Sequence, residues 1–180
     1  MILLGTIASS LLQNVDNGVM DPLQVITVGP SGASSITFSN IPNTYTHLQI
    51  RGIARMSSDV AFKVTFNGST GTYRNHYLEG TGGSAIAGTE TFSYIELYPG
   101  ISTANIFTGL VWDILDYANT NKNKVIRAFS GFDANGTGYI DLDSGLWVNT
   151  AAITSITVAC TSSATFQQFT QFALYGVKSA

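Results

Sequence analysis

The segment Val60-Ala-Phe-Lys-Val-Thr-Phe66, followed directly by Asn67-Gly68, indicates the fold class of this chain. Its apolar residues recur at every second position, which is the period of a β-strand with one buried and one exposed face. Asn-Gly is a dipeptide typical of a tight turn after a strand. Alternating runs that end at turn signals recur through most of the chain, which therefore predicts an all-β protein.

Alternating segments on both sides of this stretch give the other expected strands. We expect strands at 35–39, 46–54, 60–66, 73–78, 91–98, 107–117, 124–132, 139–148, 153–160 and 170–177. The glycine-rich segment at 80–88 predicts a loop. No segment has the pattern of a stable amphipathic helix. Turn signals return at roughly 8–15 residues, the spacing of sandwiches and jelly rolls. The sequence therefore predicts a single jelly-roll-like antiparallel β-sandwich.

The N-terminal segment departs from this pattern. Residues 1–30 have an irregular hydrophobic pattern and end at Gly29-Pro30, so we expect an N-terminal docking arm there and the β-sandwich domain at residues 31–180. No basic residue precedes the first apolar stretch, which does not fit a signal peptide. Such an arm can add a strand to a neighbouring subunit. The apolar side chains expected to dock are Ile2, Leu3, Leu4, Leu11 and Leu12.

The composition is poor in charge and rich in apolar residues. Charged residues make up 11% of the 180 positions and hydrophobic residues 44%, while Ser, Thr and Asn stand where Lys and Glu usually cover a surface. Because protein interfaces are depleted of Lys and Glu, such a surface suits packing against other protein copies. Such a composition is common in assembled extracellular or virion β-proteins and less common in soluble metabolic enzymes.

Charge and cysteine content exclude several classes of partner. The net charge of −3 and the pI near 5.1 argue against nucleic acid, because phosphate binding needs clustered Lys and Arg. No apolar run approaches the roughly 20 residues that a membrane-spanning helix needs, so membrane insertion is not expected. The single cysteine, Cys160, excludes an internal disulfide and a multi-cysteine zinc site, and its apolar surroundings indicate a buried thiol.

One turn resembles part of a calcium loop. Four residues stand at positions where the calcium loop of an EF-hand has its oxygen ligands: Asp133, Asn135, Thr137 and Asp141. The loop is incomplete, because Ser144 stands where the bidentate Glu belongs and no helix signal flanks it. We interpret the segment as a hairpin turn, with these four residues as an incomplete calcium candidate, and expect neither a bound metal nor a cofactor.

No catalytic constellation stands out. Asp113 and Asp116 lie near the end of one expected strand, but their odd spacing places them on opposite faces, which disfavours a glycosidase acid/base pair. Ion pairing with the lysines beyond the following turn is the simpler interpretation. His47 and His76 fall on separate strands without metal-ligand spacing. We therefore expect no enzymatic activity.

Tyrosines gather in the sequence around the glycine-rich segment. Tyr73, Tyr77, Tyr94 and Tyr98 precede and follow it. These rings suit either of two roles, stacking on a carbohydrate or packing at a subunit interface, where Tyr is enriched. The sequence leaves both open.

Most of the chain after the arm resembles a family of small virion structural proteins of tailed bacteriophages, notably marine and cyanobacterial phages. The resembling stretches include Phe66-Asn-Gly-Ser-Thr-Gly71 and Asp113-Ile-Leu-Asp-Tyr-Ala-Asn-Thr-Asn-Lys122, together with 35–54, 144–157 and 169–178. The resemblance implies a virion structural or fibre-like β-sandwich and no catalytic residues. Asp141 and Asp143 depart from the usual neutral strand of the family.

These observations lead to one leading hypothesis and one alternative. The first is a non-enzymatic capsid decoration or cement protein, a homotrimer that docks through its arm on other virion proteins such as the major capsid protein. It would be assembled in the host cytoplasm and exposed on the particle surface. The alternative is the receptor-binding head of a tail fibre or spike that binds host surface glycan.

Overall fold

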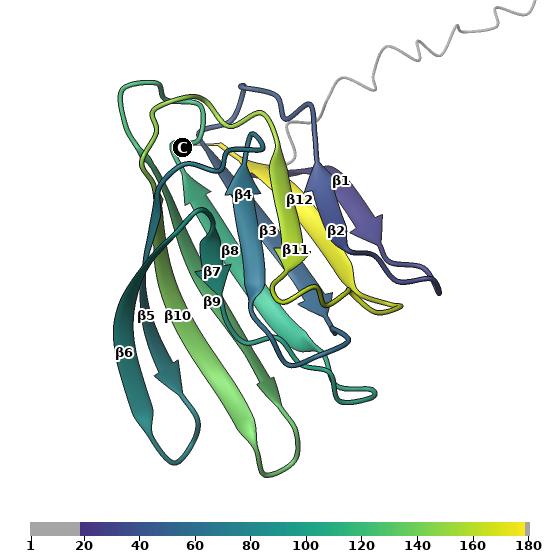
Figure 1. Ribbon diagram of the computed structural model, residues 1–180. Helices are drawn as coiled ribbons and strands as arrows, with labels where there is room; N and C mark the ends of the chain where they lie inside the picture. The colour runs from purple at the N-terminus through teal and green to yellow at the C-terminus, as the bar shows by residue number, and fades with distance from the viewer. Residues whose placement is uncertain (1–18, 179–180) are drawn as a thin grey trace, which may run out of the picture.

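The chain forms an all-β sandwich, as the alternating sequence predicts. The computed structural model describes residues 19–178, which contain twelve strands in two antiparallel sheets and no helix. Figure 1 shows the two sheets packed face to face. The jelly-roll order of the strands stays a prediction.

The two sheets differ in size. The large sheet has eight strands in the order β1-β12-β3-β8-β9-β10-β5-β6, and the small sheet has four in the order β2-β11-β4-β7. The large sheet contains β1 (Met20–Thr27), β3 (His47–Ala54), β5 (Tyr73–Gly80), β6 (Ala85–Phe92), β8 (Thr108–Leu115), β9 (Lys124–Asp133), β10 (Gly138–Trp147) and β12 (Gln171–Val177). The small sheet contains β2 (Ser35–Phe38), β4 (Phe62–Phe66), β7 (Ile95–Leu97) and β11 (Ile156–Cys160).

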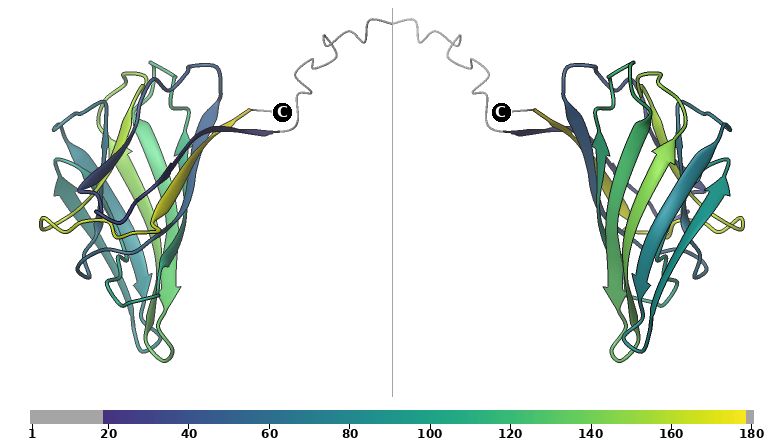
Figure 2. Two further views of the ribbon diagram at one scale, coloured as in Figure 1. Left: turned by 90° about the vertical axis from the view of Figure 1, so that its right-hand side faces the viewer. Right: turned by 90° about the vertical axis from the view of Figure 1, so that its left-hand side faces the viewer.

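The small sheet covers only part of the large one. The hairpin ends of β5–β6 and β9–β10 reach past its rim in Figure 1, and the side views of Figure 2 show the same overhang. The inward face of the large sheet is therefore packed against the small sheet at one end and open at the other.

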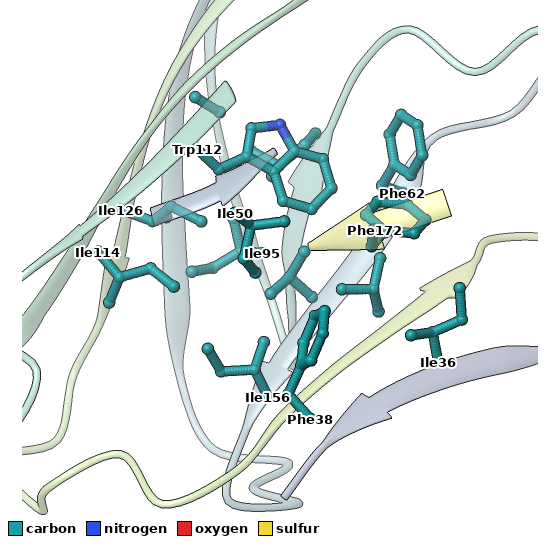
Figure 3. Close-up of a cluster of buried hydrophobic side chains, with 14 of the residues drawn as sticks. Ile36, Phe38, Ile50, Phe62, Ile95, Trp112, Ile114, Ile126, Ile156 and Phe172 are labelled. Atoms are coloured by element: carbon teal, nitrogen blue, oxygen red, sulfur yellow. The ribbon is translucent and has the colours of Figure 1, made fainter. Parts of the chain in front are cut away.

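The core forms where the alternating residues of the two sheets meet. Phe62, Val64 and Phe66 of β4 are fully buried, whereas the residues between them are partly exposed. Across the sandwich, the Phe62 ring meets Trp112 of β8 edge to face with centroids 5.2 Å apart. Figure 3 shows these rings among the surrounding isoleucines. Cys160 is buried in the same core, and burial raises the pKa of its thiol to about 12.

The Asn67-Gly68 turn does not close a hairpin, although the dipeptide is typical of one. The strand before it, β4, lies in the small sheet, and the next strand, β5, lies in the large sheet. Asn67 has a φ of 53°, and its Oδ1 accepts hydrogen bonds from the backbone N–H groups of Thr154 and Ser155. The turn therefore crosses between the sheets and is fixed by a distant loop.

The segment expected as a glycine-rich loop contains a strand. Ala85–Phe92 forms β6 at the edge of the large sheet, and the strand expected at 91–98 is divided between β6 and the short β7 of the small sheet. Most side chains of β6 are small and exposed, so this edge strand lacks the apolar alternation that marks its neighbours.

The described part of the expected N-terminal arm belongs to the sandwich. Met20–Thr27 forms β1, which pairs with β12 at the edge of the large sheet, with a bulge between Pro22 and Gln24. Leu23 and Ile26 pack against the core. The expected docking residues Ile2, Leu3, Leu4, Leu11 and Leu12 lie outside the described residues.

Candidate functional site

An apolar row crosses the outer face of the large sheet. It contains one residue from each of the eight strands, each directly opposite the next: Val25, Ala173, Arg51, Val111, Phe129, Leu142, Leu78 and Ala87. Arg51 is the only charged member of the row. The outward face of an antiparallel sheet is normally polar, so this row departs from the expected pattern.

The middle of the row is well exposed. Leu78, Phe129 and Leu142 are each about half exposed, at 51%, 47% and 52%, and Val111 beside them is 36% exposed. Complete burial of such a side chain stabilises by about 1.5–3 kcal/mol, so each half-exposed residue would gain about 1 kcal/mol if a partner covered it. We call this row, together with Ile53 and Ile140 at its side, the apolar face.

A groove runs beside the row. Gly109 and Gly131 lie opposite each other on β8 and β9, flanked by Val111, Phe129 and Ile140, and the hollow above them has a volume of about 610 Å³. A Cβ added to Gly109 would meet nothing closer than the Gly131 carbonyl oxygen, at 4.0 Å. The groove is therefore open space that a side chain from another molecule can fill.

The opposite face of β10 carries carboxylates where apolar residues are usual. Asp141 and Asp143 point between the sheets and are 1% and 6% exposed, respectively. Neither oxygen of Asp141 has a hydrogen-bond partner, nor does Oδ2 of Asp143. Burial and the negative charge of Glu79 raise the pKa of Asp141 to about 7, and burial and the charge of Asp141 raise the pKa of Asp143 to about 8.

Two further carboxylates extend this cluster toward the small sheet. Glu96 of β7 is buried, and burial together with the charge of Glu90 on β6 raises its pKa to about 7. The backbone carbonyl of Glu96 accepts a hydrogen bond from Nδ2 of the buried Asn75. We call these five carboxylates the acidic cluster: Glu79, Glu90, Glu96, Asp141 and Asp143. Within residues 19–178, no lysine, arginine or histidine forms an ion pair with any of them.

An open cleft lies beside the acidic cluster, at the rim that the small sheet leaves uncovered. It has a volume of about 230 Å³ and is lined chiefly by Asp59, Glu79, Tyr98, Pro99, Phe132 and Tyr139. Glu79 lies directly opposite Asp141 across β5 and β10, so the cleft adjoins the buried pair. The rings of Phe132 and Tyr139 have centroids 5.6 Å apart and form one wall.

The structure does not bring the four tyrosines named from the sequence onto one surface. Tyr73 is fully buried, and its ring stacks on Trp147 in the core. Tyr77 lies over Gly88, where an added Cβ would come within 2.5 Å of its hydroxyl oxygen. Tyr94 is half-buried and stacks on Phe92, and only Tyr98 lines the cleft.

The four calcium-candidate residues also lie apart. Asp133, Asn135 and Thr137 are exposed at the tip of the β9–β10 hairpin, whereas Asp141 is buried between the sheets. Oδ1 of Asp133 accepts a hydrogen bond from the backbone N–H of Asn135, which has a φ of 56°. This is the geometry of an Asx turn, which explains these residue types without an ion.

Asp113 and Asp116 have separate partners, and only Asp116 forms the ion pair expected with a lysine beyond the turn. Asp113 accepts a hydrogen bond from Gln49, and Asp116 forms an ion pair with Lys122 at 2.6 Å. The Asp116 N–H donates to Nδ1 of His47, while His76 is exposed on the outer face. Within residues 19–178, no three His, Cys, Asp or Glu side chains are grouped so that they could hold a metal ion.

Sequence reasoning missed both the apolar face and the acidic cluster, although β10 contains the signal for both. Asp141 and Asp143 are separated by even intervals from Trp147, whose size favours the core. Alternation then places the two aspartates inside and the two aliphatic residues between and before them, Leu142 and Ile140, outside.

Comparison with known proteins gives no relative from which to transfer a function: no protein-family model, no curated protein and no solved structure matches the chain. Residues 19–178 contain no helix long and apolar enough to cross a membrane.

Proposed function

We propose that this chain is a non-enzymatic structural protein of a bacteriophage virion, a decoration or cement protein that associates with further copies of itself through the apolar face. The observation that carries the proposal is the row of half-exposed apolar side chains across the outer face, with Val111, Phe129, Leu142 and Leu78 at its centre. Exposed apolar patches of this kind mark interaction sites.

The size of the face suits a second copy of the chain. Eight strands about 4.8 Å apart, each about eight residues long, give the whole outer side of the large sheet an area of about 35 Å by 25 Å, and the apolar face is a band across it. A stable interface removes roughly 800 Å² of surface from each partner, which is close to this area. A trimer is the proposed assembly, and the N-terminal segment is proposed to dock the assembly on the capsid.

The low charge of the chain supports the same proposal. Only 11% of residues are charged, and no lysine lies in the apolar row or beside the groove. Desolvating lysine is costly, and its absence leaves the face free to be buried. The resemblance of the sequence to small virion proteins of tailed phages supports the setting.

Cryo-electron microscopy of intact particles tests the proposal. Density for the sandwich at capsid three-fold or quasi-three-fold axes, with the apolar face between copies, is the expected result. Density at the tip of a tail appendage would favour the receptor-binding head instead. Density with the apolar face turned to solvent would overturn the proposed mode of assembly, and absence of the chain from particles would overturn the proposed function.

A further inference from the structure

We propose that the cleft between the rim of the small sheet and the β9–β10 hairpin binds an organic cation, either an alkylammonium or a guanidinium group. This is the chemistry of a lysine or arginine side chain on a partner protein and of a free polyamine. The inference does not depend on the proposed virion role.

The first argument is the charge of the cleft. Asp59 and Glu79 line it, and none of the lining residues is basic. Asp141 lies behind Glu79, directly opposite it on the neighbouring strand. Lys63, opposite Glu96 on β4 and β7, has its Nζ 4.9 Å from the centroid of the Tyr94 ring and, within residues 19–178, forms no ion pair with the acidic cluster. The cleft therefore lacks an internal counter-charge.

The second argument is the missing partners of the buried pair. With both carboxyls ionised, both Asp141 oxygens and Oδ2 of Asp143 are buried without a hydrogen-bond donor, whereas a proton on one lets the two side chains hydrogen-bond to each other. An unpartnered buried carboxylate costs several kcal/mol in free energy, so it is retained where a proton or a cation satisfies it. A positive group in the adjoining cleft would contact Glu79, which lines it, and would lower this cost at Asp141 and Asp143 through its electrostatic field.

The third argument is the wall of the cleft. Tyr98, Phe132 and Tyr139 contribute aromatic rings, and Pro99 adds an apolar surface. Aromatic faces attract cations that also carry an apolar body, and such sites recognise ammonium and guanidinium groups. A hard metal ion would need converging oxygen ligands, and no group of three acidic or imidazole side chains in residues 19–178 provides them. Carboxylates with aromatic rings therefore favour an organic cation.

Binding should strengthen as the pH rises. The acidic groups that act on Asp141 and Asp143 are Glu79 of β5 and Glu90 of β6, and Glu96 of β7 interacts in turn with Glu90 and Tyr98. Because burial and mutual repulsion raise the pKa of Asp141 and Glu96 to about 7 and of Asp143 to about 8, protons and the cation compete near neutral pH.

Titration of the full chain by ¹⁵N–¹H NMR tests the proposal, in a buffer free of amines. The probes are butylammonium and propylguanidinium, with butanol, methyl glucoside and calcium chloride as comparisons. We expect saturable shifts at the Glu79, Tyr98 and Tyr139 amides with the two cations at pH 8, and at least about tenfold weaker binding at pH 5.5. A short lysine peptide binding more tightly than butylammonium would identify a protein partner, and spermidine binding more tightly would identify a free polyamine.

Variants make the test specific. Glu79→Gln should weaken cation binding about tenfold or more, and Tyr139→Leu should weaken it as well. Asp113→Asn, which removes a carboxylate from the outer face, is the matched control and should change nothing. The proposal is overturned if butanol binds as well as butylammonium. The proposal is also overturned if calcium or methyl glucoside saturates the site and the organic cations do not. Unchanged cation binding in Glu79→Gln would overturn it as well.

Discussion

Asp141 and Leu142 are neighbours in β10 but occupy opposite environments: the carboxylate is 1% exposed between the sheets, while the leucine is 52% exposed on the outer face. A strand of a sandwich normally buries its apolar residues and exposes its charged ones. The inversion destabilises the isolated chain on both faces, since it buries charge and exposes apolar surface. A partner on the outer face and a cation at the inner one would each offset part of this cost.

The buried pair makes stability depend on pH. The pKa of Asp143 rises from 3.8 to about 8, so the folded protein holds the proton more tightly than the unfolded chain does. The free energy of unfolding is therefore highest near and below pH 4 and falls as the pH rises toward 8. A rise of about four units, at about 1.4 kcal/mol for each unit of pKa, sets an upper limit of roughly 6 kcal/mol, and we expect Asp143→Asn to stabilise the protein by a few kcal/mol at pH 8.5.

Urea unfolding at pH 5 and pH 8.5, in amine-free buffer, measures this effect. At pH 5 the stabilisation by Asp143→Asn should be smaller than at pH 8.5, because the folded carboxyl is protonated and neutral there and only the unfolded chain is ionised. Asp113→Asn is the control and should leave the pH dependence unchanged. A wild-type free energy of unfolding that rises between these two pH values would contradict the prediction.

The sequence predicts the layout of the strands better than their environment. The alternation of Phe62, Val64 and Phe66 gives both the strand and its buried face, because three large apolar residues specify one side. Asn67-Gly68 predicts a turn but not its destination, since the hydrogen bonds of Asn67 to Thr154 and Ser155 depend on tertiary contacts. The edge strand β6 was not predicted, because its small side chains bury little surface and therefore show no apolar alternation in the sequence.

The candidate site was harder to predict for a different reason. Alternation along 139–148 separates the aspartates from the aliphatic residues, and Trp147 alone, in step with the aspartates, indicates which set is buried. The small sheet decides this, because its strands cover the face that carries Trp147. The cleft depends further on where the small sheet ends, which residues distant in sequence determine.

Filling the groove should block self-association without disturbing the fold. Gly109→Val places a side chain that favours strands into open space above Gly131, where the nearest atom to the added Cβ is 4.0 Å away. We expect the dissociation constant for self-association to rise at least about tenfold, with an unchanged melting temperature. Sedimentation equilibrium gives the association constant. Gly83→Val, in a loop with no atom near its Cβ, is the matched control.

A charge placed in the apolar row should also prevent self-association. Leu142→Asp places a charge at the centre of the row, opposite Phe129 and Leu78, and desolvating it would cost several kcal/mol in any interface. We expect the variant to remain monomeric at concentrations where the wild type associates. A wild-type chain that is monomeric at every concentration would rule out association through this face.

A buried lysine should contribute strongly to the free energy of unfolding. Lys124 is fully buried, and its Nζ donates hydrogen bonds to the carbonyl oxygens of Asn119, Lys122 and Thr150 at 2.6–2.8 Å. Lys124→Met keeps the apolar stem but leaves three carbonyl groups without a donor, so we expect a loss of about 3 kcal/mol in urea unfolding. The control, Lys122→Met, removes an exposed ion pair with Asp116 and should cost less than about 1 kcal/mol.

Two truncations should separate docking on the capsid from folding. Removal of residues 1–18 leaves β1 in place, so the melting temperature should not change, whereas attachment to particles should be lost. Removal of residues 1–30 also deletes β1 with Leu23 and Ile26, which pack against the core, and uncovers the edge of β12. At about 1.5 kcal/mol for each of these aliphatic side chains, and about 2–4 °C per kcal/mol, the melting temperature should fall by about 10 °C. Co-sedimentation with shells that lack the protein measures attachment, and attachment of the shorter truncation at wild-type levels would show that docking uses the sandwich itself.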